Sequence, residues 1–231
     1  MHDGSLVRPG RLKSVKVRAA SDRGAATRQR LLEVAIRIFA TRGFDGARTR
    51  DIAEAARTNV VSILYYFGNK EGLYKAAAFQ VATRLASYQE PFVQRARASM
   101  SRPGIKRQEL VGVLSDLMCD FLRLVLGDFL PDCYGRFANQ VVYGPIHALH
   151  VIDRVLAPLR VTVAEAIAIL TGESATCQAT QVRALSMIGS CSVFRRGRYT
   201  VMHGLKRKQI GARELKVIEQ GIRANIKAMF S

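Results

Sequence analysis

Residues 49–74 read TRDIAEAARTNVVSILYYFGNKEGLY, and this stretch decides the fold. Thr49 predicts the start of a short helix, with Asp51 in its first turn, where the helix dipole favours a carboxylate. A three-residue break follows, and its last residue, Asn59, predicts the cap of a second helix that runs to about Tyr66. Two short helices joined by so tight a break are typical of a helix-turn-helix, whose second helix enters the DNA major groove.

The flanking residues extend this unit on both sides. Asn69 predicts the cap of a third helix that starts at Lys70. Before the stretch, apolar residues recur at helical spacing between Ala25 and Thr41, and Gly43 predicts the end of that helix. Residues 25–74 are therefore expected to form a DNA-binding domain.

Four pieces of sequence in this region resemble the TetR family of bacterial transcription regulators. In chain order they are RIFATRGFDGA at 37–47, TRDIAEAA at 49–56, LYYF at 64–67 and NKEGLY at 69–74. The resemblance covers about residues 27–80 and depends on the order and spacing of all four pieces. It implies a transcription regulator that binds double-stranded DNA.

Two positions depart from the family's usual pattern. Arg57 stands where relatives usually have glycine, at a turn position that favours a positive φ, and an arginine held there costs about 1 kcal/mol. Leu64 and Tyr66 stand where related proteins often have a polar or aromatic residue and a histidine. The expected fold is unaffected, but a base preference does not carry over.

After residue 75 the chain has the pattern of helices separated by Gly and Pro breaks. Helices are predicted over residues 70–89, 106–126, 136–142, 146–170, 178–199 and 212–230. The first of these is expected to end before Pro91, and the fourth to bend or restart at Pro158. The last has an apolar stripe at Leu215, Ile218, Ile222, Ile226 and Met229. With the three helices before them, they give an all-α protein of about nine helices.

The second half also resembles one TetR subgroup, the CerR-type proteins. The matching segments are VLAPLR at 155–160, RALSMIGSCSVFRRGR at 183–198 and IGARELKVIEQGIRANIKAM at 210–229. The resemblance implies that residues 75–231 form a helical effector-binding and dimerisation domain, whose last two helices pair with those of a second subunit. The apolar stripes of both helices fit this use, since such a stripe must be covered.

The TetR resemblance places ten residues at the DNA. Two lie near the backbone, five point toward base edges and three reach phosphates: Thr49 and Arg50; Asn59, Val60, Val61, Ser62 and Leu64; Tyr65, Tyr66 and Lys70. Hydroxyls, a cation and a helix N-terminus suit phosphate oxygens, and small apolar side chains suit thymine methyl groups. The alternative is that Tyr65 and Phe67 only fill the small core, which fits Phe67 better than Tyr65.

Two histidines in the second half invite comparison with a metal site. His147, His150 and Asp153 follow one another at intervals of three, but the spacing matches no zinc signature, so no metal is expected. The family instead implies a ligand cavity, for which the candidate residues are Met118, Phe121, Phe137, Tyr143, His147 and His150. An apolar stripe of this kind is also typical of plain core.

The formal charge of +18 is concentrated at the two ends of the chain. Residues 1–30 carry +6 and residues 195–231 carry +8, whereas residues 31–75, which hold the motif, carry only +2. Residues 1–24 mix Gly, Ser and basic residues, which is typical of a disordered tail. An arm that lies along phosphates or enters the minor groove is the functional alternative.

Composition and motifs argue against several other classes. With 48% hydrophobic and 23% charged residues, no apolar run of bilayer length and no signal peptide, the chain is expected to be cytoplasmic without a membrane partner. The four cysteines form no CxxC pair and are expected to be reduced. The sequence has no nucleophile elbow, phosphate loop or zinc-protease motif, so neither an enzyme nor a cofactor is expected.

The resulting hypothesis is a sequence-specific transcription regulator. It would act as a ligand-responsive repressor, a homodimer on a palindromic operator whose half-sites lie one helical turn or a multiple apart. Its partners would be double-stranded DNA, a small-molecule effector and a second copy of the chain. The alternative is a constitutive basic DNA-binding protein without an effector, whose binding ignores sequence and falls steeply with salt.

Overall fold

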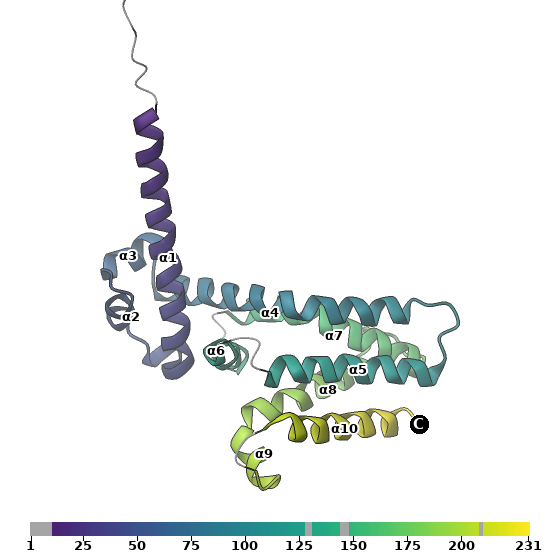
Figure 1. The fold of residues 1–231 in the computed structure, drawn as a ribbon. Helices are drawn as coiled ribbons and strands as arrows, with labels where there is room; N and C mark the ends of the chain where they lie inside the picture. Colours follow the sequence, from purple (N-terminus) through teal and green to yellow (C-terminus); the bar gives the residue numbers. More distant parts are fainter. Residues whose placement is uncertain (1–10, 128–130, 144–147, 208–209) are drawn as a thin grey trace, which may run out of the picture.

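The computed structural model describes residues 11–127, 131–143, 148–207 and 210–231. These residues form ten helices and no strand, which confirms the all-α class and adds one helix to the nine expected (Figure 1). In chain order they are α1 (Arg11–Gly46), α2 (Thr49–Ala55), α3 (Val60–Phe67), α4 (Lys70–Met100), α5 (Arg107–Leu126), α6 (Asp132–Tyr143), α7 (Leu149–Thr171), α8 (Gln178–Arg196), α9 (Arg198–Gly204) and α10 (Ala212–Met229).

The first helix begins much earlier than expected. α1 starts at Arg11, so the backbone of residues 11–24 is helical where a disordered tail was predicted. This segment has no proline, and its one glycine is its last residue, so nothing in it breaks the helix that Leu31 to Phe39 anchor in the core. The predicted break at Gly43 is confirmed, because Gly43 has φ 68° and ψ −177° inside α1.

Two helices continue through a proline. α4 was expected to end before Pro91 but runs on to Met100, because Phe92 and Val93 are buried beyond the proline and packing outweighs the lost hydrogen bond. α7 likewise continues through Pro158. The buried Gln89 amide donates to the Val155 carbonyl at 3.0 Å and ties the two helices together near both prolines.

The described residues form two hydrophobic cores. The first joins α1, α2, α3 and the start of α4 to α6, with the ring of Phe137 stacked at 5.9 Å on Phe39 and edge-to-face at 5.1 Å with Tyr74. The second lies among the end of α4, α5, α7, α8 and α10. Figure 1 shows α4 running from the N-terminal helices along the second half, so this one helix contributes to both cores.

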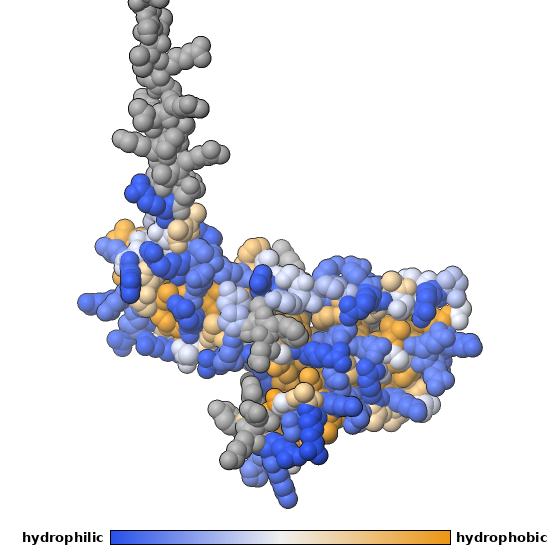
Figure 2. Space-filling view, in the orientation of Figure 1, coloured by the Kyte–Doolittle hydropathy of each residue, from blue (hydrophilic) through white to orange (hydrophobic). Residues whose placement is uncertain are grey.

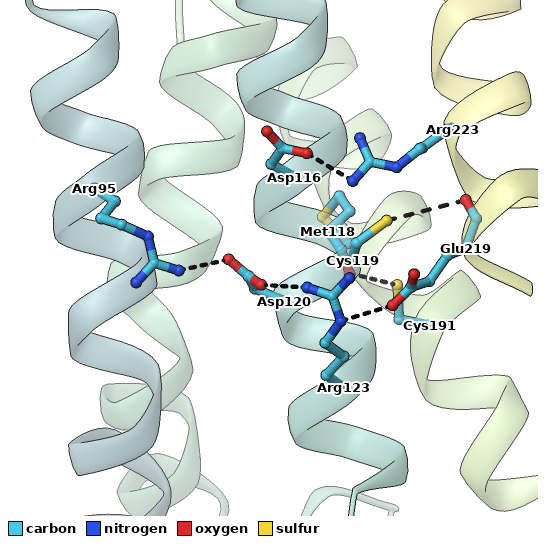
Figure 3. A network of polar contacts seen from close by, with 9 residues as sticks. All are labelled: Arg95, Asp116, Met118, Cys119, Asp120, Arg123, Cys191, Glu219 and Arg223. Carbon is cyan, nitrogen blue, oxygen red and sulfur yellow. Dashed lines mark hydrogen bonds and ion pairs between the residues drawn. The ribbon is translucent and has the colours of Figure 1, made fainter. Parts of the chain in front are cut away.

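A polar network fixes α10 and α4 to α5 (Figure 3). Asp120 accepts hydrogen bonds from Arg95 at 2.7 Å and Arg123 at 2.9 Å, and Arg123 also pairs with Glu219 of α10 at 2.7 Å. A second pair, Asp116 with Arg223 at 2.6 Å, joins the same two helices. In the described part of the chain, no helix is both long and apolar enough to cross a bilayer.

The cysteines are free thiols, as expected; Cys191 lies in the second core, and Cys119 of α5 is also buried. Burial raises the pKa of Cys119, and it raises the pKa of Cys191 to about 12. Both thiols therefore stay protonated at neutral pH, which makes them poor nucleophiles and poor metal ligands.

Candidate nucleic-acid interface

The N-cap of the first motif helix lies one residue earlier than predicted. Arg48 is the N-cap of α2 and makes no side-chain cap bond, whereas Thr49 is already the first helical residue. The reason is that the Ile52 amide donates to the Arg48 carbonyl at 3.2 Å, which sets the first helical hydrogen bond. Asp51 lies in the first turn, as predicted, and pairs with Arg42 at the end of α1.

The turn after α2 has the positive φ that its position predicted. Arg57 has φ 52°, in the left-handed region, and its side chain is exposed. Its amide donates to the Glu54 carbonyl and the Thr58 amide donates to the Ala53 carbonyl, both at 2.9 Å. These two bonds form a Schellman motif, which ends α2 and redirects the chain into α3 despite the missing glycine.

The second helix of the motif exposes an apolar face. Asn59 caps α3 as predicted, with its side chain accepting from the Val61 amide at 3.1 Å. Ile63 is buried and holds α3 in place, while Val61, Leu64 and Tyr65 point away from the core with exposed fractions of 63%, 55% and 81%. So large an exposed apolar and tyrosine surface on one short helix marks an interaction site.

The other two aromatic residues of the cluster pack inward. Phe67 contacts the first core and lies under the guanidinium of Arg28, 5.2 Å from its ring centre, so the core-filling alternative holds for Phe67. The half-buried Tyr66 meets Tyr65 edge-to-face at 4.9 Å, and a Cβ added to Gly24 would lie 3.3 Å from its hydroxyl. α1 therefore passes directly beside the end of α3.

The start of α4 completes the surface. Asn69 caps this helix as predicted, accepting from the Gly72 amide at 2.8 Å. The Lys70 ammonium lies 4.5 Å from the centre of the Phe44 ring and donates to the Asp45 carbonyl at 3.4 Å. Lys70 thus has a structural contact with the end of α1, which its predicted phosphate role alone would not require.

All ten residues predicted at the DNA lie on α2, α3, the α3 cap or the first residue of α4. Arg50, Asn59, Val61, Leu64 and Tyr65 are exposed, and the remaining five are half-buried. Sequence reasoning missed Arg28, which lies on α1 beside Phe67. Nothing in the sequence around Arg28 indicates that its guanidinium lies on the ring of Phe67, which is on another helix.

Of the six residues proposed for a ligand cavity, the four whose side chains the structure describes do not share one site. Met118 and Phe121 are buried in the second core, whereas Phe137 is in the first, because α6 turns its apolar face to α1 and α4. His150 is exposed at the start of α7; His147 and the side chain of Tyr143 lie outside the described residues. Nowhere in the described ranges do three or more His, Cys, Asp or Glu side chains gather as a metal site would require.

A cavity of about 450 Å³ lies between α8 and α10 and reaches Met118. Its lining includes Phe194 and Met187 from α8 and Val217, Ile218 and Met229 from α10. In the space-filling view, hydrophobic residues are visible in the region of α5, α8 and α10 (Figure 2). This part of the surface differs from the polar surroundings and is apolar enough to bind another protein surface.

The two short helices α2 and α3, joined by a Schellman motif and with the outer face of α3 exposed, are the arrangement of a helix-turn-helix DNA-binding protein. Residues 31–77 match the model of the bacterial regulatory proteins of the tetR family, and residues 110–231 match that of the C-terminal domain of the HTH-type transcriptional dual regulator CecR. The chain therefore belongs to the TetR family of transcription regulators, with a CecR-type C-terminal domain. CecR is the correct name of the subgroup expected above as CerR.

Individual relatives agree with this assignment. The chain is 27% identical to the dual regulator CecR of Shigella flexneri over 80% of this chain and 82% of that protein. It is 41% identical to the transcriptional repressor AcnR of Corynebacterium glutamicum over 29% of this chain and 36% of that protein. Both proteins are transcription regulators by name.

Solved structures agree with the fold. AibR in complex with isovaleryl coenzyme A and operator DNA superposes with a TM-score of 0.57 at 18% identity, over 86% of this chain and 97% of that chain. FadR from Bacillus subtilis in complex with stearoyl-CoA superposes with a TM-score of 0.51 at 14% identity, over 86% of this chain and 96% of that chain. At these identities the likeness concerns the fold alone.

Proposed function

We propose that this regulator represses transcription from a palindromic operator, as a homodimer whose DNA affinity responds to a small-molecule effector. The observation that carries the proposal is the outer face of α3, where the apolar side chains of Val61 and Leu64 and the ring of Tyr65 are all more than half exposed. Burial in a major groove would cover them. A cytoplasmic location, where the DNA is, follows from this role.

The contacts that we propose are divided by chemistry. Val61 and Leu64 suit thymine methyl groups, since both are apolar and exposed on the same helix. The Tyr65 hydroxyl, the Arg50 guanidinium and the Lys70 ammonium suit phosphate oxygens. Because only phosphate contacts are independent of sequence, loss of Leu64 is expected to relax base preference, whereas loss of Arg50 weakens all sites alike.

Dimerisation is proposed through α8 and α10, but not through the whole stripes that the sequence indicated. Ile218, Ile222 and Ile226 of the α10 stripe are buried against α5 and others of the same chain, so they are not free for a partner. The free apolar residues are Val182, Leu185 and Val193 on α8 and Val217 and Met229 on α10, each more than half exposed. A second copy would cover them by pairing the same two helices.

The first experiment is selection of bound DNA from a random pool at physiological salt. Recovery of a palindrome is expected, and Tyr65→Ala should weaken binding to it by about tenfold or more while the melting temperature stays within about 1 °C, because the side chain makes little contact with the core. Ile169→Ala removes an equally prominent apolar side chain on α7, 55% exposed and away from α3, and serves as the matched control.

Two results would contradict the proposal. A pool without a common sequence, combined with binding that falls steeply with salt, would favour the constitutive basic DNA-binding protein. Equal weakening by Tyr65→Ala and Ile169→Ala would show that α3 is not the contacting helix. Loss of effector response alone, with palindrome recognition intact, would overturn only the ligand-dependent part.

A further inference from the structure

A second cavity, of about 810 Å³, lies where α1, α4 and α6 meet. α1 contributes Arg28 and Leu32, α4 contributes Phe79, Gln80 and Arg84, and α6 contributes Tyr134. It is separate from the cavity of about 450 Å³ between α8 and α10, called the apolar groove below, and the two share no lining residue. Its walls come from both the helix that supports the helix-turn-helix and the helices of the second half.

The charge of this cavity is positive. Arg28 and Arg84 line it, and none of its described lining residues is Asp or Glu. Neither arginine forms an ion pair with a described residue; instead the Arg28 guanidinium lies 5.2 Å from the Phe67 ring centre and that of Arg84 lies 5.7 Å from the Tyr88 ring centre. Two cations without a carboxylate partner among the described residues can both donate to an incoming anion.

The same cavity has an apolar wall. Phe79 of α4 is 65% exposed although it is aromatic, and the buried Leu32 also lines the cavity. Gln80 donates to the Tyr134 hydroxyl at 3.2 Å, which fixes the far wall and leaves the Tyr134 proton available to an acceptor. An exposed ring, two guanidinium groups and a hydroxyl donor match a flat apolar molecule with a negatively charged end.

We propose that this cavity binds a small organic anion with an aromatic or similarly flat body. Arg28 and Arg84 would hold its carboxylate, sulfonate or phosphate group, and Phe79 would stack on its body. Arg28 also lies on Phe67, the last residue of α3, so an anion that draws the guanidinium away changes a contact of the recognition helix. The binding is independent of the proposed function, whereas this effect on DNA affinity rests on it.

The binding is tested by fluorescence titration of the full chain with 8-anilinonaphthalene-1-sulfonate, an aromatic anion whose emission rises in apolar surroundings. The double variant Arg28→Gln with Arg84→Gln should weaken the dye by about tenfold or more, since it removes two charge-assisted contacts. Thr83→Trp, which places a large side chain on the exposed α4 wall of the cavity, should do the same. Melting temperatures verify that the variants fold.

Two control variants distinguish this cavity from dye binding elsewhere on the protein. Lys106→Gln removes an exposed cation at the start of α5, outside the cavity, and should leave the dye affinity within about twofold. Ser186→Trp fills the apolar groove between α8 and α10 and should also leave it unchanged. Loss of the dye in Ser186→Trp with retention in Thr83→Trp would place the dye in the groove and overturn the proposal.

The effect on DNA is measured separately, on the operator that the random pool provides. The dye should change operator affinity by about threefold or more in the native chain and not in the double variant. If the dye binds at the cavity without altering operator affinity, the site stands and its coupling to α3 is refuted. If no operator is recovered, the dye titration still decides whether the cavity binds an organic anion.

Discussion

At Arg57 a single residue bears the strain of the turn between the two motif helices. Its φ of 52° is readily adopted by glycine, and an arginine there costs about 1 kcal/mol. Arg57→Gly is therefore expected to raise the free energy of unfolding by about 0.5 kcal/mol or more, the larger freedom of glycine in the unfolded chain offsetting part of the gain. Urea unfolding measures it.

The control for this change is a glycine introduced at a helical position of α2, the helix that this turn ends. Arg50→Gly, inside α2, should lower the free energy of unfolding by about 1 kcal/mol, because glycine is a poor helix former. Equal effects of the two substitutions would refute the assignment of strain to the turn.

Tyr74 is a buried residue in the first core whose ionisation makes stability depend on alkaline pH. Its hydroxyl has no hydrogen-bond partner among the described residues, and burial raises its pKa from 10.0 to about 12. The unfolded chain loses this proton near pH 10, whereas the folded chain keeps it until about pH 12. Between these pH values the unfolded state binds fewer protons, so stability should fall as the pH rises.

Tyr74→Phe is expected to reduce the alkaline loss of stability by the share that Tyr74 causes, while the share of Cys191 remains. It should also raise the free energy of unfolding at neutral pH by about 1 kcal/mol, since it deletes an unsatisfied buried hydroxyl. Thermal melts at pH 7 and over the alkaline range measure both effects. In the matched variant Tyr134→Phe the lost hydroxyl has a partner, Gln80, and stability should drop instead. An equal drop in Tyr74→Phe would show that its hydroxyl is satisfied.

At the scale of elements, the junction of α3 and α4 depends on Gly72. A Cβ added there would lie 2.0 Å from the Phe67 carbonyl oxygen, so the two helices could not approach as they do. Gly72→Ala is expected to lower the free energy of unfolding by about 2 kcal/mol and to reduce operator binding by displacing α3. Gly112→Ala in α5, where no atom lies within 4 Å of the added Cβ, should be neutral or stabilising.

The helix caps at Asn59 and Asn69 could be predicted from neighbouring residues, whereas the features that the sequence did not predict depend on contacts between residues far apart in the chain. Asn59 and Asn69 cap as predicted because a cap needs only its own first turn. Pro91 failed to end α4 because Phe92 beyond it is buried by helices far along the sequence. Phe137 joined the first core for the same reason, since its partners lie about a hundred residues earlier or on α4.

The candidate DNA surface shows the same division. The sequence predicted the helices that carry all ten residues, although Thr49 is the first residue of α2 and not its cap. Three consecutive aromatic residues after Leu64, however, do not indicate which of their side chains point outward. Tyr65 is outward and Phe67 inward because Ile63 anchors α3 against the core, a contact that only the fold supplies. The proposed roles of the ten residues at bases and phosphates stay predictions.

Over the whole molecule, α4 links the two cores, because it contributes buried residues to both of them. Tyr74 and Val93 lie on the same helix, one in each core, and Phe137 brings α6 against α1. The cavity between α1, α4 and α6 is therefore bounded by elements that must shift if the two halves move relative to one another. A molecule bound there would favour one arrangement over another in proportion to its differential affinity.

The exposed apolar residues of α8 and α10 lead to the last prediction, which concerns assembly. Leu185 is 55% exposed on α8, so Leu185→Glu should leave the fold of one chain intact while placing an unpaired charge in the proposed dimer interface. Sedimentation velocity should show a monomer at concentrations where the native chain is a dimer. Affinity for a full palindrome should fall toward that for one half-site, because the second recognition helix no longer binds together with the first.

Ile169→Glu, with the same exposed fraction on α7, is the matched control and should remain dimeric. If Ile169→Glu dissociates the dimer and Leu185→Glu does not, the interface lies on α7 rather than on α8 and α10.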